Sequence, residues 1–245
     1  MQYEGYSLVW NDEFNDTGIN SNHWVFETGD GCPNLCGWGN NELEYYRTQN
    51  AWVGEEVLTL EARKENFGGR NYTSARLKTQ GKKSFKYGRI DIRALLPKGQ
   101  GIWPALWMLG NDISNIGWPK CGEIDIMEMV GGQGKDNQVH GTLHWDNGSG
   151  HASYGQSYTL PSGIFAGAYR VFTLIWTETS MKWYVDDQIF NTVDITDPSM
   201  SEFHQPFFFI LNVAVGGNWP GSPDATTVFP QQMKVDYIRV FQKNQ

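Results

Sequence analysis

The sequence lacks long apolar runs and has little basic charge. Its 245 residues contain 19 Lys and Arg against 27 Asp and Glu, which gives a formal net charge of −8. Nucleic-acid binding requires clustered cations that displace counterions from phosphates, so this charge balance argues against a nucleic-acid partner. No stretch approaches the roughly 18 apolar residues that a membrane span needs. We therefore expect neither nucleic acid nor a membrane as a partner.

Cysteine is also scarce, with three residues and hence an odd count. Cys32 and Cys36 flank three residues in a Gly-rich segment, where they could form a local disulfide or stay free. We expect Cys121 to be an unpaired, buried thiol. The first residues do not show the charged and then apolar pattern of a secretory leader. We expect a secreted domain whose leader is absent from this sequence.

Helical periodicity is nearly absent outside short stretches such as residues 197–203. Instead, strand-like runs separated by turn residues recur along the chain. They span residues 6–10, 57–63, 72–79, 87–95, 101–109, 123–130, 138–144, 170–177, 181–185, 206–215 and 233–241. The last run alternates cleanly and could pair near the first. Because no repeat or linker divides the chain, we expect a single all-β domain over residues 1–245, built as a β-sandwich of two curved antiparallel sheets.

Three acids, Glu123, Asp125 and Glu128, alternate with large apolar residues in the strand-like segment 121–129. Side chains of a strand alternate between its faces, so Glu123 and Asp125 share one face while Glu128 would point into the core. An acid buried there without a partner would cost several kcal/mol or have a strongly raised pKa. We therefore predict a β-bulge at Met127, which returns Glu128 to the face of Glu123.

Three acids on one face repel one another, so at least one should hold its proton near neutral pH. The spacing alone is more typical of a solvated sheet face. However, several Trp residues and His144 flank the acids, and the chain holds 11 Trp, 11 Tyr and 13 Phe, more than its core needs. Aromatic faces stack on sugar rings. Paired carboxyls about 5 to 5.5 Å apart are the machinery of a retaining glycosidase.

On these residues the chain resembles glycoside hydrolase family 16, and within it the laminarinase-like endo-β-1,3-glucanases. The resemblance runs nearly end to end. Its centre is the family's Glu-x-Asp-x-x-Glu signature at residues 123–128, supported by segments 37–46, 87–90, 103–109 and 235–240. It implies a jelly-roll sandwich with an open substrate cleft, and retaining hydrolysis within a β-1,3-glucan chain. Strict β-1,3 cutting and action on mixed-linkage β-1,3/1,4-glucan are not separated by it, because that choice depends on loop shapes.

The resemblance also implies residue roles. Glu123 would be the nucleophile and Glu128 the acid/base, with Asp125 assisting electrostatically. The glucose subsites would be lined by Asn40, Arg76, Arg89, Trp103, Trp107, Trp118, His144, Asn212 and Trp219. Catalysis would need no cofactor, but a structural calcium ion away from the cleft would bind Glu13, Asp236 and the backbone carbonyl of Gly54. An ordinary surface position for Asp236 is the competing interpretation. We expect a monomer whose partner is a β-glucan polysaccharide or oligosaccharide.

Three other functions compete with this interpretation. A non-catalytic β-glucan-recognition module would keep the aromatics but lose one or both catalytic acids, whereas this chain has all three. A hydrolase of agarose, carrageenan or porphyran on the same fold would need extra basic residues or a reshaped cleft. A structural sandwich without a ligand would not place Trp residues beside acids. These comparisons favour a glucan hydrolase.

Overall fold

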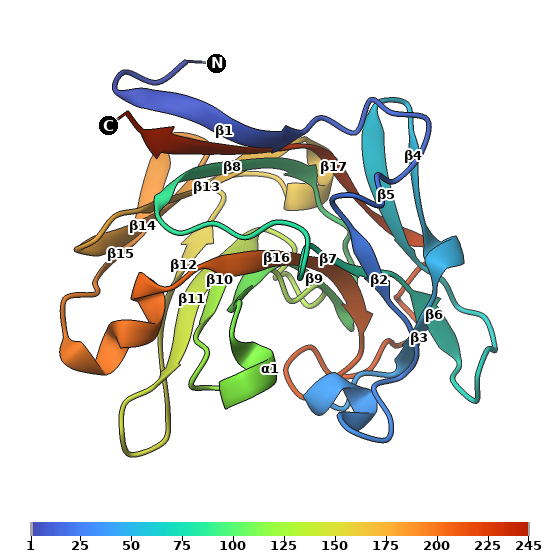
Figure 1. The fold of residues 1–245 in the computed structure, drawn as a ribbon. Helices are drawn as coiled ribbons and strands as arrows, with labels where there is room; N and C mark the ends of the chain where they lie inside the picture. The colour runs from blue at the N-terminus through green and yellow to red at the C-terminus, as the bar shows by residue number, and fades with distance from the viewer. Residues whose placement is uncertain (1, 245) are drawn as a thin grey trace.

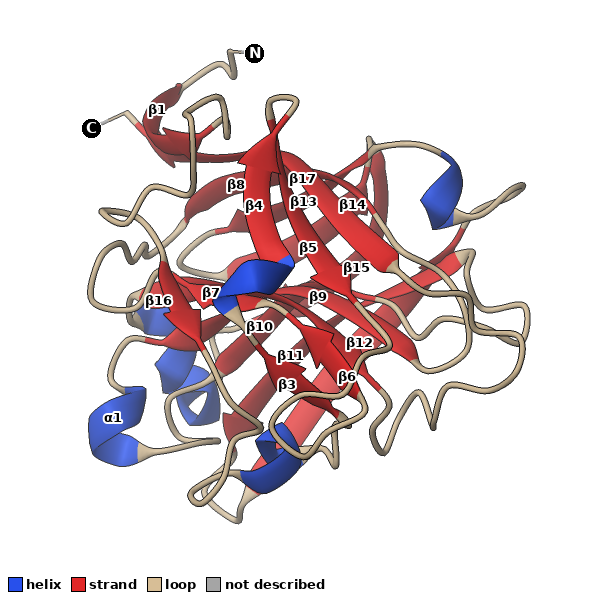
Figure 2. Cartoon of the chain, turned by 90° about the vertical axis from the view of Figure 1, so that its right-hand side faces the viewer, coloured by secondary structure: helices blue, strands red, loops and turns tan. Residues whose placement is uncertain are grey.

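Two curved antiparallel sheets face each other in the computed structural model, which describes residues 2–244 (Figure 1). Within these residues, one sheet has the strand order β15-β14-β13-β8-β17-β5-β4, with β1 paired to β17. The other has the order β12-β11-β10-β9-β16-β7-β2. Figure 2 shows the sheets as stacked layers, with the short helices at their periphery. The predicted all-β jelly-roll sandwich is confirmed. No helix of the described part is long and apolar enough to cross a membrane.

The first sheet, here called the outer sheet, consists of β1 (Tyr6–Asp12), β4 (Ala51–Gly54), β5 (Val57–Ala62), β8 (Gly88–Leu95), β13 (Arg170–Trp176), β14 (Ser180–Val185), β15 (Gln188–Asp194) and β17 (Gln231–Lys243). The second, the cleft sheet, consists of β2 (Val25–Glu27), β7 (Arg76–Lys78), β9 (Ile102–Gly110), β10 (Glu123–Glu128), β11 (Gln138–Asp146), β12 (His151–Thr159) and β16 (Phe207–Val215). A small parallel pair joins β3 (Glu44–Tyr46) to β6 (Tyr72–Ser74). The helices are α1 (Ile113–Ile116) and the 3-10 helices η1 (Cys36–Gly39), η2 (Thr48–Asn50), η3 (Phe165–Gly167) and η4 (Pro198–His204).

The core lies between the two sheets and explains the apolar half of the strand pattern. Ile124 and Met127 of β10 are 0% exposed and share one cluster with Leu174, Trp176 and Trp183 of the outer sheet. Full burial of such a side chain stabilises the fold by roughly 1.5 to 3 kcal/mol. All nine residues of β16 are buried, because this central strand is covered on both faces. The acids between these core residues are therefore left on the opposite face of the cleft sheet.

Most predicted strands are present, and the terminal runs pair as expected, with Leu8 opposite Phe241. The predicted helical stretch at 197–203 corresponds to η4, whose Asp197 side chain accepts a hydrogen bond from the Ser199 amide. Cys32 and Cys36 form a disulfide, and Cys121 is buried and free. Several strands were not predicted: β2, β3, β4, β12 and β15. The extent of one domain over the whole chain stays a prediction, which the core shared by both sheets supports.

Candidate active site

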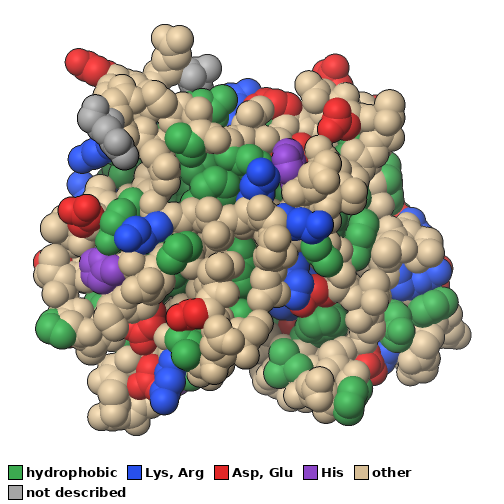
Figure 3. Space-filling view, in the orientation of Figure 1, with side chains coloured by type: hydrophobic (Ala, Val, Ile, Leu, Met, Phe, Trp, Pro, Cys, Tyr) green, Lys and Arg blue, Asp and Glu red, His purple; other side chains and the backbone are tan. Residues whose placement is uncertain are grey.

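A cleft of about 610 Å³ opens on the free face of the cleft sheet, and Figure 3 shows the hollow at the lower edge of the molecule. The three predicted catalytic acids line it. So do most of the predicted substrate-binding residues, namely Asn40, Arg76, Trp103, Trp107, Trp118, His144, Asn212 and Trp219. These side chains come from β7, β9, β11 and β16 and from three loops. The fold thus gathers residues from distant parts of the sequence at one face.

Arg89 does not belong to this group, so its prediction as a subsite residue is wrong. It lies on β8, in the outer sheet. Its Nε donates to both carboxylate oxygens of Asp91 at 2.9 and 3.0 Å, and its guanidinium carbon lies 3.9 Å from the ring centroid of Tyr3. Asp91 is 1% exposed. Arg89 therefore neutralises a buried carboxylate on the side of the sandwich away from the cleft.

The geometry of the acids depends on an irregularity of β10. Asp125 lies opposite Trp107 of β9, but Met127 lies opposite Leu106, so two steps along β10 match one step along its neighbour. On the other side, the register with β11 also shifts between Asp125 and Glu128. This β-bulge places one extra residue in the strand and returns Glu128 to the cleft face. The predicted bulge is confirmed.

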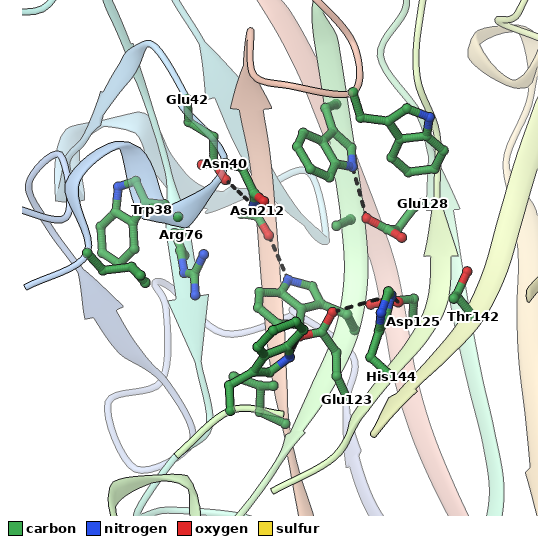
Figure 4. A pocket seen from close by; sticks show the side chains of 18 of the residues that line it. Trp38, Asn40, Glu42, Arg76, Glu123, Asp125, Glu128, Thr142, His144 and Asn212 are labelled. Carbon is green, nitrogen blue, oxygen red and sulfur yellow. Dashed lines mark hydrogen bonds and ion pairs between the residues drawn. The ribbon is translucent and has the colours of Figure 1, made fainter. Parts of the chain in front are cut away.

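Each of the two glutamates predicted to be catalytic accepts a hydrogen bond from an indole N–H group (Figure 4). Trp118 Nε1 donates to Glu123 Oε2 at 3.0 Å, and Trp103 Nε1 donates to Glu128 Oε1 at 2.9 Å. These bonds constrain both carboxyl groups from outside β10. The orientation of each carboxyl group is therefore fixed by a different tryptophan.

His144 lies between the acids on the neighbouring strand β11. Its Nε2 is 3.3 Å from Asp125 Oδ2 and 3.8 Å from Glu123 Oε1. One atom each of Glu123, Asp125 and His144 lie within 4.8 Å of one another. Asp125 is 2% exposed, which makes it the most enclosed of the three acids. His144 is thus placed to stabilise negative charge on this part of the cleft.

Burial dominates the protonation of the acids. It raises the pKa of Asp125 to about 8. It also raises the pKa of Glu123 to about 8; the charge of Asp125 adds to this, while His144 and the Trp118 N–H act in the opposite direction. Burial, reinforced by Asp125, raises the pKa of Glu128 to about 8, against the effect of Trp103. Because these groups interact, their protons are released as a coupled set, and at neutral pH the cluster retains protons.

One wall of the cleft combines aromatic faces with hydrogen-bonding groups. The guanidinium of Arg76 lies between two indoles, 4.6 Å from the ring centroid of Trp38 and 5.0 Å from that of Trp107. Its Nε donates to Glu27 at 2.6 Å, which fixes the orientation of the planar group. Trp107 Nε1 in turn donates to Asn212 Oδ1 at 2.7 Å. Indoles cover sugar faces and guanidinium or amide groups bind hydroxyls, so this wall suits a pyranose ligand.

Sequence reasoning missed several residues of the cleft, including Trp38, Glu42, Thr142 and His151. Trp38 and Glu42 lie in the segment around Asn40, where neighbouring positions could have been included. Thr142 precedes His144 by two residues on β11, and the period of a strand places both on one face. No comparable signal exists for His151, because β12 itself was not predicted.

Comparison with known proteins finds similarity to several glucanases and to other proteins. It is 43% identical over 255 residues to a β-glucanase of Rhodothermus marinus, covering 96% of this chain and 85% of that protein. It is 38% identical to glucan endo-1,3-β-glucosidase A1 of Niallia circulans and 41% identical to the clotting factor G α subunit of Tachypleus tridentatus. The match covers 98% and 97% of this chain, but only 38% and 34% of those two longer proteins.

Solved structures agree with the sequence matches. The laminarinase catalytic domain of Thermotoga maritima superposes with a TM-score of 0.93 at 50% identity, covering 99% of this chain and 100% of that one. The endo-β-1,3-glucanase of Pyrococcus furiosus superposes with a TM-score of 0.90 at 43% identity, covering 98% and 95%. The family model for glycosyl hydrolases family 16 matches residues 37–239, which include the bulged strand and every acid of the cleft described above. The chain belongs to glycosyl hydrolases family 16.

Proposed function

We propose that this protein is a retaining glycoside hydrolase that cleaves internal bonds of β-1,3-glucan. The observation that carries the proposal is the bulge in β10, which presents Glu123 and Glu128 on one cleft face. Their indole partners hold both carboxyl groups toward the ligand space. The names of the relatives, laminarinase and endo-1,3-β-glucanase among them, support glucan as the substrate.

The contacts of the two glutamates support different roles for them. Glu123 faces both Trp118 and His144, which stabilise its carboxylate, so it is the acid that ionises and attacks the anomeric carbon. Glu128 keeps its proton and donates it to the departing glycosidic oxygen as the bond from the anomeric carbon to that oxygen breaks. Glu128, now ionised, then takes a proton from water, whose oxygen displaces Glu123 from the anomeric carbon. The anomeric configuration is retained after two displacements.

Asp125 acts through its neighbours. It lies between the two glutamates in the strand, and its charge raises the pKa of both. Its burial favours the protonated form, in which it can donate a hydrogen bond toward the carboxylate of Glu123. Asp125 thereby adjusts the charge of the nucleophile without entering the covalent chemistry.

Product analysis tests this function and its rivals. Laminarin, lichenan, agarose and carrageenan are incubated with the unmutated protein and with Glu123→Ala and Glu128→Ala. We expect short β-1,3-linked oligosaccharides from laminarin with the unmutated protein alone, and retained configuration by NMR of the first products. Release from agarose or carrageenan, or equal release by the variants, would contradict the proposal. Binding of laminarin without any product would instead support a recognition module.

Mixed-linkage glucan is a second candidate substrate, favoured by one specific observation. A non-specific endo-β-1,3(4)-glucanase of family 16 superposes with a TM-score of 0.88 at 38% identity, covering 98% of this chain. The lichenan arm of the product analysis measures this activity directly. The ratio of kcat/KM on laminarin to that on lichenan then ranks the two linkages.

We also propose that the protein is secreted and monomeric. The Cys32–Cys36 disulfide supports an oxidising compartment, and an insoluble or cell-wall polymer is reached outside the cell. Thiol titration of protein recovered from culture medium, with and without denaturant, should detect Cys121 alone. Light scattering at assay concentrations should give a mass near 27.8 kDa. Retention in cells or a doubled mass would contradict these two proposals.

The calcium site is proposed at the edge of the outer sheet. Strand pairing supports the proposal: Gly54 pairs with Val57 beside β17, and Glu13 follows the β1 residue that pairs with Ile238. Asp236 lies at a register shift of β17 in the same region. Two carboxylates and a carbonyl are ligands that calcium prefers.

The two carboxylates of this site accept hydrogen bonds from arginines, which an ion would replace. Arg239 donates to both oxygens of Glu13 at 2.8 Å, and Arg93 donates to Asp236. We therefore expect calcium to raise the melting temperature in a saturable way, and Asp236→Asn to abolish that increase. Calorimetric unfolding in EDTA and in graded calcium measures it. An unchanged melting temperature would exclude the site.

A further inference from the structure

His151 is the first residue of β12, the edge strand of the cleft sheet. Its Nε2 lies 2.9 Å from Nδ1 of His144, with an interplanar angle of 18° between the rings. Its other close ring neighbour is Trp118, at a centroid distance of 4.6 Å. His151 thus contacts two side chains of the cleft at once.

These two neighbours are the groups that face the nucleophile. Trp118 Nε1 donates to Glu123 Oε2 at 3.0 Å, and His144 Nε2 lies 3.8 Å from Glu123 Oε1. Among the described residues, His151 itself has no hydrogen bond or ion pair to an acid of the cleft. It is therefore connected to both oxygens of Glu123 through one intermediate side chain each.

The hydrogen bond between the two imidazoles restricts where the hydrogens lie. One ring nitrogen must donate and the other must accept, because two lone pairs or two N–H groups cannot pair. When His151 Nε2 donates, His144 Nδ1 accepts and the hydrogen of His144 is at Nε2. That N–H then points toward Asp125 Oδ2, 3.3 Å away, and toward Glu123.

We propose that His151 is a positioning residue of the nucleophile: it holds His144 with its N–H toward Asp125 and Glu123, and it holds the Trp118 indole against Glu123. The inference rests on the hydrolysis proposed above. Burial, followed by His144, lowers the pKa of His151, which favours the neutral ring that donates a single hydrogen.

Other titratable groups surround this pair. Glu123, Asp125 and Glu128 face it from β10, and Asp146 of β11 lies opposite His151 in the strand register. Glu202 of η4 accepts a hydrogen bond from the Asp146 amide at 3.2 Å. Several acidic side chains therefore surround the pair, and the effect of His151 has to be isolated by substitution.

Two substitutions separate the two contacts. His151→Phe keeps a ring against Trp118 but loses the hydrogen bond, whereas His151→Gln keeps an amide donor near His144 but loses the ring. His151→Ala removes both. Groups that orient metal-binding histidines contribute roughly 10 to 100-fold, and by analogy we expect His151→Ala to lower kcat on laminarin about tenfold with KM within about twofold. Each of the other variants should lose less than His151→Ala.

The pH profile provides a readout that a purely structural role would not change. Loss of the donor to His144 should move the acid limb of kcat/KM to higher pH in the Phe and Ala variants, and less in the Gln variant. Tyr154→Phe is the matched control, because Tyr154 lies three residues along β12 on the opposite face and is 45% exposed. Its kcat and acid limb should equal those of the unmutated protein.

Unchanged kcat and acid limb in all three variants would overturn the proposal, as would a rise in KM alone, which would make His151 a substrate contact. If His151→Ala fails to fold by circular dichroism, the Phe and Gln variants decide the question. An unmutated protein that releases no sugar from laminarin or lichenan would refute the proposed function itself. That outcome is distinct from an active enzyme that tolerates every change at His151.

Discussion

The proposed roles of Glu123 and Glu128 can be tested separately, because a different indole donates a hydrogen bond to each of them. Removing one indole N–H group should move only one limb of the pH profile. Trp118→Phe and Trp103→Phe each keep an aromatic face for a sugar but remove the N–H that stabilises one carboxylate. Loss of such a donor favours the protonated acid and raises its pKa. The two variants are therefore matched in chemistry and differ only in the glutamate they affect.

The magnitude follows from the contact. A hydrogen bond to a charged group contributes about 1.5 to 3 kcal/mol, but Trp118 is 48% exposed and water replaces part of the lost bond. An effect of about 1 kcal/mol remains, and 1.36 kcal/mol corresponds to one pKa unit, so the shift is about 0.7 unit. Activity on the affected limb should change about fivefold.

The sign differs between the two variants. Glu123 must be ionised to attack, so a raised pKa in Trp118→Phe moves the acid limb of kcat/KM to higher pH and lowers activity there. Glu128 must be protonated to donate, so a raised pKa in Trp103→Phe moves the alkaline limb to higher pH and raises activity there.

Initial rates on laminarin between pH 4 and 10 measure both limbs. A Trp118→Phe variant whose alkaline limb moves, or a Trp103→Phe variant whose acid limb moves, would refute the roles. A rate that climbs through alkaline pH without a second limb would refute acid catalysis by Glu128.

Three further predictions concern the bulge, the cleft wall and the outer sheet. Deletion of Met127 should restore a regular strand in which the second glutamate, now four positions after Glu123, stays on the cleft face; we expect laminarin hydrolysis to be retained within about tenfold, whereas Glu128→Ala should abolish it, as activity assays would show. Arg76→Lys should raise KM about tenfold with little change in kcat, because a flexible ammonium replaces the stacked planar group; an unchanged KM would count against its contact with substrate. Arg89→Gln should leave KM unchanged but cost about 1 to 3 kcal/mol in urea unfolding, since Asp91 would stay buried without its cation, and a large rise in KM would restore the rejected subsite role.

Some of the site could be predicted from local pattern because the physical constraint is itself local. In the segment containing Glu123 and Glu128, the alternation of acids with core residues permits only a bulge or a buried unpaired acid. The bulge has the lower free energy, and the structure contains it. The burial of Ile124 between the acids was decided in the same way, by the two-residue period of a strand.

Other features could not be obtained in this way. Arg89 lies in a clear strand pattern, but a pattern does not state which of two sheets a strand joins, and β8 joins the outer sheet. His151 begins an edge strand whose residues are mostly exposed, so no hydrophobic alternation marks it. The pairing of β12 with β11 alone brings this ring to His144.

The sequence by itself determined the fold class and the bulged strand that presents the predicted catalytic acids, because burial and alternation act between near neighbours in the chain. Tertiary structure alone decided which distant side chains meet those acids. Trp103 and His144 meet Glu128 and Glu123 through the order of the strands, which depends on contacts between residues far apart in the sequence. Trp118 is only five residues from Glu123, but the path of its loop decides that the two side chains meet. The tertiary structure also decides the protonation of the acids, since their pKa values follow from the burial and charges that the assembled cleft creates.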